Sequence, residues 1–115
     1  MFGLARDIPK LTERLVGLEH RIAELRAEQV VVVNGLNKGQ AHLTDASRSL
    51  TEYVQARCDV SPETARGLVF AGTTFGRHQS VSDRMAYGRI TFDRAVATVV
   101  YLRAGATTED ASQVW

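Results

Sequence analysis

The chain has 115 residues, of which 44% are hydrophobic and 23% are charged. These values are ordinary for one globular domain and exclude global disorder. The formal net charge of +1 is too small to mark the whole chain as a binder of polyanions. The single cysteine, Cys58, excludes an internal disulfide framework. No uncharged run approaches the length of a membrane span, and charged residues interrupt the N-terminal segment, so we expect no membrane span, no signal peptide and a cytoplasmic location.

Positive charge is concentrated in one part of the chain. Residues 61–103 carry six arginines against three acidic residues, whereas residues 1–60 carry equal numbers of both signs. Arginine suits phosphate recognition because its planar fork donates two hydrogen bonds at once. Twelve of the fourteen basic residues are arginine, and a genome whose codons favour arginine and alanine is the alternative that explains the larger share of this preference over lysine.

An apolar seam runs along the first predicted helix. Its members recur with alternating spacings of 4 and 3 residues, and they are Leu4, Ile8, Leu11, Leu15, Leu18, Ile22 and Leu25. We expect Asp7 to be the N-cap of this helix, with Pro9 in its first turn. We expect Val30–Val33 to be the buried C-terminal end of the helix and Asn34-Gly35 to terminate it. A long amphipathic helix in a small domain more often packs on its own chain. Pairing of the seam with another chain is the alternative.

Capping signals divide the remaining sequence into short helices. Ser49 and Glu52 form a predicted capping box, Ser61 with Pro62 opens a second short helix, and Thr91 opens a later one. Another helix is expected from Ser80 or Ser82 to Tyr87, and the segment from Thr107 to Trp115 resembles the cut end of a longer chain. The sequence therefore predicts an all-α fold, with a long N-terminal amphipathic helix packed on four or five shorter helices. The residues expected to be largely buried are Leu15, Leu18, Ile22, Val54, Leu68, Val96 and Val99.

No pattern of residues points to catalysis. The histidines His20, His42 and His78 are far apart in the sequence, and none has a second ligand at metal-binding spacing. We expect His20 on the exposed side of the first helix and Cys58 on an inward face as a small core residue. The prediction is a chain that is not itself an enzyme and that uses no cofactor and no metal.

The segment Leu50–Val69 fits a helix-turn-helix with Asp59 at the turn. The five positions that such a motif requires to be apolar hold Val54, Cys58, Val60, Ala65 and Leu68. The residues predicted to contact nucleic acid are Arg57, Glu63, Thr64, Arg66 and Arg77. The segment departs from the usual helix-turn-helix pattern at two positions. Asp59 takes the place of the usual turn glycine, and Gln55 stands where a small residue normally allows the two helices to approach. Ordinary packing within a helical bundle explains the same pattern.

Four segments together resemble an actinobacterial repeat family. They are Ser49-Leu-Thr-Glu-Tyr-Val, Val60-Ser-Pro-Glu-Thr-Ala-Arg66, Gly88-Arg-Ile-Thr-Phe-Asp-Arg-Ala95 and Ala104-Gly-Ala-Thr-Thr-Glu-Asp-Ala111. The N-terminal helical region of that family is a domain of unknown function (number 222), often fused to an HNH endonuclease module. The resemblance implies that residues 1–115 form one helical domain, the N-terminal part of a longer architecture. The residues of the nuclease site have no counterpart in this chain, so they are not carried over.

Two functions are consistent with these observations. The first is a non-catalytic module that binds double-stranded DNA or positions a target, with arginines between residues 57 and 94 on the phosphates. The second is a protein-interaction or assembly module, such as a homodimer, that uses the Leu4–Leu25 seam.

Overall fold

The computed structural model describes residues 4–44 and 46–105, and the side chains from residue 7 onward within them. The described part is all-α and contains no strand, which confirms the predicted fold class. The elements are α1 (Leu4–Lys38), the 3-10 helix η1 (Ala41–Leu43), α2 (Leu50–Cys58), α3 (Pro62–Thr74), the 3-10 helix η2 (Phe75–Arg77), α4 (Gln79–Ala86) and α5 (Phe92–Arg103). The expected segment from Thr107 to Trp115 lies outside the described residues.

The first helix is longer than the sequence indicated. It begins at Leu4, so Asp7 lies inside the first turn and is not the N-cap, and Pro9 lies within the helix. It also continues through Asn34 and Gly35 to Lys38. The Asn34 side chain donates a hydrogen bond of 2.9 Å to the carbonyl of Gly72 on α3, so this residue serves a tertiary contact and does not end the helix.

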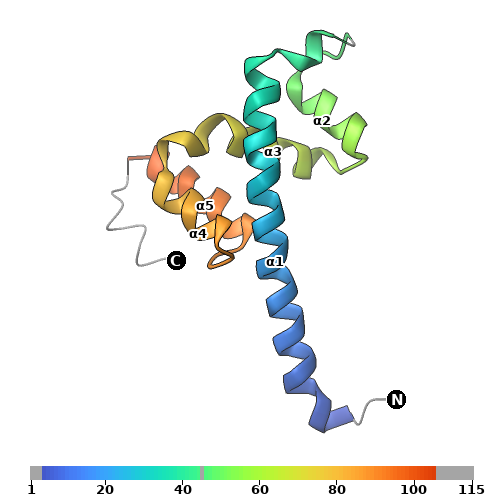
Figure 1. Cartoon of the computed structure of the whole chain (residues 1–115), viewed down its shortest axis with the longest axis vertical. Helices are drawn as coiled ribbons and strands as arrows, with labels where there is room; N and C mark the ends of the chain where they lie inside the picture. The colour runs from blue at the N-terminus through green and yellow to red at the C-terminus, as the bar shows by residue number, and fades with distance from the viewer. Residues whose placement is uncertain (1–3, 45, 106–115) are drawn as a thin grey trace.

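The N-terminal half of α1 projects beyond the rest of the chain (Figure 1). Every side chain from Ile8 to Glu19 is exposed, and the first buried residue on the helix is Ala23. The prediction that Leu15, Leu18 and Ile22 are buried was therefore wrong, with exposed fractions of 68%, 43% and 42%. The physical reason is that the shorter helices are too few and too short to reach along the whole of a 35-residue helix of about 50 Å.

Local capping follows the sequence closely. The side chains of Ser49, Ser61 and Thr91 each accept a backbone N–H from the residue three positions later, at 3.1 Å. The Glu52 carboxylate does reach back, but it accepts the N–H of Arg48 rather than that of Ser49. The predicted starts of α2, α3 and α5 are thus confirmed, and Asp59 ends α2 in the left-handed conformation.

Two hydrophobic clusters form the core. The larger one joins α1, α3, η2, α4 and α5, and its buried members include Ala23, Phe75 and Val99. The smaller one joins α1, α2 and α3 and contains Val33 and Leu68. Helix α3 contributes to both clusters, and α1 passes across it (Figure 1).

The observed burial of individual residues agrees with the sequence predictions at some positions and differs at others. Val54, Leu68 and Val99 are buried, as expected, whereas Val96 is only half-buried beside the larger cluster. Cys58 is exposed, contrary to the expectation of a core residue, because it is the last residue of a short helix. His20 is half-buried, and its Nδ1 donates to the carbonyl of Gly88, so it does not lie on an exposed face as expected.

Candidate functional site

The helix-turn-helix pair predicted from the sequence is present as two helices and a tight turn. Asp59 adopts φ 53° and ψ 48°, a left-handed conformation that glycine usually supplies and that aspartate tolerates. Of the five positions expected to be apolar and packed, Val54, Ala65 and Leu68 are buried, Val60 is half-buried and Cys58 is exposed. The pair packs with α1 around the smaller cluster, as helices in a bundle do.

The structure distributes the predicted nucleic-acid contacts over different surfaces. Glu63 and Thr64 lie in a hollow of 560 Å³ between α1, α3 and α5. Arg57, at the end of α2, lies 5.3 Å from the centroid of the Tyr53 ring and lines a separate groove. Arg66 is exposed on α3 and lines neither cavity, and Arg77 is exposed in η2 beyond the other end of that helix.

The hollow beside Glu63 carries mixed charge. Glu19 from α1 and Asp93 from α5 line it together with Glu63, and Arg26 is the basic residue among its lining side chains. The Arg26 guanidinium lies 5.8 Å from the centroid of the Phe92 ring, and it also donates a hydrogen bond of 2.8 Å to Gln29. Three acidic residues against one arginine in the hollow that Thr64 lines make this face of α3 a poor surface for phosphate.

The seam of α1 is the largest set of exposed apolar side chains in the described part of the chain. Its six described members and their exposed fractions are Ile8 59%, Leu11 43%, Leu15 68%, Leu18 43%, Ile22 42% and Leu25 62%. The side chain of Leu4, the first predicted member, lies outside those described. A continuous stripe of this kind is typical of a surface that binds another protein.

The seam and the body of the protein occupy different sides of α1. Ala23 and Val30 are buried against the other helices, whereas Ile22 and Leu25, one and two residues from Ala23, are exposed. Successive residues turn by about 100° around a helix, so the seam points largely away from the body. The folded chain therefore leaves the seam open from Ile8 to Leu18, while Ile22 also lines the hollow between α1, α3 and α5.

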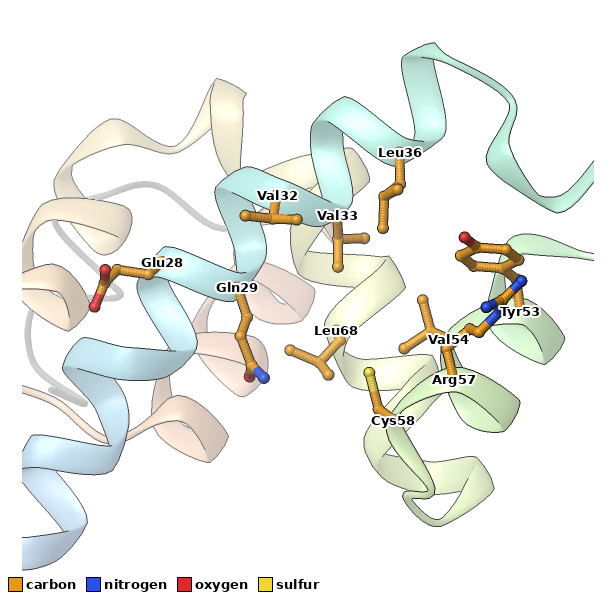
Figure 2. Close-up of a pocket in the computed structure, with 10 residues that line it drawn as sticks. All are labelled: Glu28, Gln29, Val32, Val33, Leu36, Tyr53, Val54, Arg57, Cys58 and Leu68. Carbon is orange, nitrogen blue, oxygen red and sulfur yellow. The ribbon is translucent and has the colours of Figure 1, made fainter. Parts of the chain in front are cut away.

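An apolar groove lies between the C-terminal half of α1 and α2 (Figure 2). Its volume is 270 Å³. Side chains from three helices line it, and they are Glu28, Gln29, Val32, Val33, Leu36, Tyr53, Val54, Arg57, Cys58 and Leu68. We call this the α1–α2 groove. Sequence reasoning did not predict it, because it depends on the angle at which α2 packs against α1.

The described residues contain no group of three histidine, cysteine or acidic side chains placed to hold a metal ion. None of the helices in this part of the chain has the length and apolar character needed to cross a membrane. No protein-family model, curated protein or solved structure matches the chain. The resemblance to the repeat family with an HNH-associated helical domain therefore stays a prediction.

Proposed function

We propose that this chain is a non-catalytic assembly module that self-associates through the seam of α1. One observation carries the proposal: six apolar side chains at heptad spacing are between 42% and 68% exposed on a helix that is packed in the core through a different face. Leucine and isoleucine at such positions pair helices by inserting into the gaps of a facing helix. A second copy of the chain supplies a matching seam by symmetry.

The projecting half of α1 also needs a partner for its own stability. Residues 8–19 are exposed on all sides, so no tertiary contact supports helix formation there. Most of the stability of helices in proteins comes from the packing of an amphipathic face, which this stretch does not have within its own chain. Pairing with a second α1 would bury the seam and stabilise this half of the helix.

The proposal is tested by the molar mass in solution. In sedimentation equilibrium we expect the wild type to form dimers and Leu15→Glu to be monomeric, because the substitution places a carboxylate in the middle of the seam. Val31→Glu is the matched control, since Val31 is 72% exposed on the same helix but lies off the seam. A wild type that stays monomeric, or a Leu15→Glu dimer of unchanged affinity, would refute the proposal.

Binding of duplex DNA is the second candidate. It is supported by the exposure of Arg57, Arg66 and Arg77 and by the helix-turn-helix arrangement of α2 and α3. It is disfavoured by the three acidic residues that line the same hollow as Thr64, one of the residues expected to contact nucleic acid. We therefore place it after self-association.

A further inference from the structure

We infer that the two copies associate in antiparallel orientation, and that the projecting end of each α1 covers the α1–α2 groove of the other copy. This inference rests on the proposed function, because it specifies the partner and the geometry of the same seam. It makes the groove part of the dimer interface.

The spacing of the seam continues into the groove, with one polar residue, Gln29, at the first position. Continuing the 4 and 3 spacing beyond Leu25 leads to Gln29, Val32 and Leu36, and all three line the groove. Val32 is 61% exposed. In Figure 2 these residues lie along α1 on one side of the groove, and Tyr53 lies across it on α2. A helix that packs along the seam toward the C-terminal end of α1 therefore reaches the groove.

An antiparallel pair matches the two halves of α1 to each other. We place the twofold axis midway between Leu18 and Ile22. The facing pairs, one residue from each copy, are Leu18 with Ile22, Leu15 with Leu25, Leu11 with Gln29 and Ile8 with Val32. The projecting half, which has no support in its own chain, then lies on the half that carries the groove, and the symmetry fills both grooves at once.

The amount of apolar surface favours this arrangement over a parallel one. Six leucine or isoleucine side chains that are about half exposed present on the order of 600 Å², whereas a stable interface buries about 800 Å² on each partner. In a parallel pair the second α1 would bring its own α2 and α3 against this half of the helix, whereas in the antiparallel pair it brings its projecting half, whose residues 8–19 are exposed on all sides. The antiparallel pair adds Val32, which is 61% exposed, and the groove wall from α2 to this surface.

The volume of the groove also suits side chains of a helix. Pockets for small molecules usually measure about 300–1,000 Å³ and enclose most of the ligand. At 270 Å³, the α1–α2 groove lies at the small end of this range, and α1 and α2 form its two sides. Apolar side chains such as Ile8 and Leu11 from a second α1 fit such a surface.

Charged residues beside the seam do not select an orientation. The antiparallel register brings Arg14 to Glu28 of the second copy but also brings the two Arg21 side chains together. The parallel register pairs Arg14 with Glu19 and Arg21 with Arg26. Exposed pairs of this kind each contribute less than about 1 kcal/mol, so the apolar contacts determine the orientation.

Engineered cysteines distinguish the two orientations. In a Cys58→Ser background, Ile8→Cys together with Val32→Cys is expected to form a covalent dimer on mild oxidation. These two positions lie about 36 Å apart on one helix, so they cannot form a disulfide within one chain. Leu11→Cys alone in the same background is the control, because it meets its own copy only in a parallel dimer.

The outcomes separate this inference from the proposed function. A covalent dimer from the Ile8→Cys/Val32→Cys chain, without one from Leu11→Cys, supports groove docking. A covalent dimer from the Leu11→Cys chain, whether or not the Ile8→Cys/Val32→Cys chain also forms one, overturns groove docking. It leaves self-association through the seam intact. A wild type that sediments as a monomer overturns both.

The native cysteine provides a second test without any change to the chain. Cys58 is exposed and lines the groove, so a second α1 in the groove would shield its thiol. Alkylation of Cys58 by iodoacetamide should slow roughly tenfold at protein concentrations where the dimer predominates, because only the monomer fraction reacts. The rate in Leu15→Glu should not depend on concentration. A wild-type rate that is equally independent of concentration, in a sample that sediments as a dimer, would overturn groove docking.

Discussion

Asn34 on α1 donates a hydrogen bond of 2.9 Å to the carbonyl of Gly72, in the last turn of α3. The last four carbonyls of a helix lack intrahelical partners, so this bond satisfies one of them. The same crossing is tight, because a Cβ atom added to Gly72 would lie 2.6 Å from Cγ1 of Val33. Glycine at position 72 thus allows the close approach of the two helices that join both hydrophobic clusters.

Gly72→Ala is expected to destabilise the fold. Val33 is β-branched, buried and unable to move aside easily, so the added methyl group should cost about 1–3 kcal/mol despite the better helix propensity of alanine. Urea unfolding measures the difference. Gly35→Ala is the matched control, because nothing lies within 4 Å of its added Cβ, and it should gain about 0.5–1 kcal/mol. Equal effects of the two substitutions would contradict the tight crossing.

Two adjacent valines on α5 test the placement of the core. Val99 has no exposed surface and Val100 is 53% exposed. Val99→Asp would bury an unpaired carboxylate and should cost more than about 3 kcal/mol, whereas Val100→Asp should change the stability by about 0.5 kcal/mol or less. Thermal unfolding followed by circular dichroism measures both. Similar melting temperatures for the two variants would show that α5 presents another face to the core.

The turn between α4 and α5 requires glycine at position 88. Gly88 has φ 69°, and an added Cβ would lie 3.0 Å from Oε1 of Glu24 and 3.1 Å from the carbonyl oxygen of His20. Gly88→Ala should therefore cost about 1–3 kcal/mol from backbone strain and crowding. Gly17→Ala has open space around it and should not destabilise the protein. Differential scanning calorimetry compares the two, and an unchanged melting temperature for Gly88→Ala would refute the prediction.

Self-association should make the stability depend on concentration. A protein that dimerises only when folded gains stability by mass action, so the melting temperature of the wild type should rise with protein concentration. Leu15→Glu should show no such rise. It should also lose part of its helical signal in circular dichroism, because the projecting half of α1 is then unsupported. A melting temperature independent of concentration in the wild type would count against the dimer.

The DNA-binding hypothesis predicts a specific effect of Arg66→Ala. If Arg66 contacts a phosphate, the variant should bind duplex DNA of every sequence more weakly. The slope of the logarithm of the binding constant against the logarithm of the salt concentration should become shallower by about one unit. Its thermal stability should stay nearly unchanged, since the side chain is exposed. Arg21→Ala, which removes an exposed arginine of α1, is the control. Identical titrations at two salt concentrations for all three proteins, or no binding at low salt, would remove the hypothesis.

The sequence alone determined the helical class and the starts of three helices. The side chains of Ser49, Ser61 and Thr91 cap their helices through atoms only three residues away, so these contacts are encoded locally. The periodic apolar residues of α1 and α5 likewise identified helices, because the helical repeat is a property of the local backbone. The seam itself was visible in the sequence.

Only the tertiary structure decided which apolar residues find a partner within the chain. Leu15 and Val30 belong to the same helix and are similarly apolar, yet the first is 68% exposed and the second 6%. The difference arises from the positions of α3, α4 and α5, which reach the C-terminal half of α1 and leave the first turns free (Figure 1). The pattern of one helix specifies an apolar face, but burial of that face depends on contacts between segments far apart in the sequence, which the pattern does not contain.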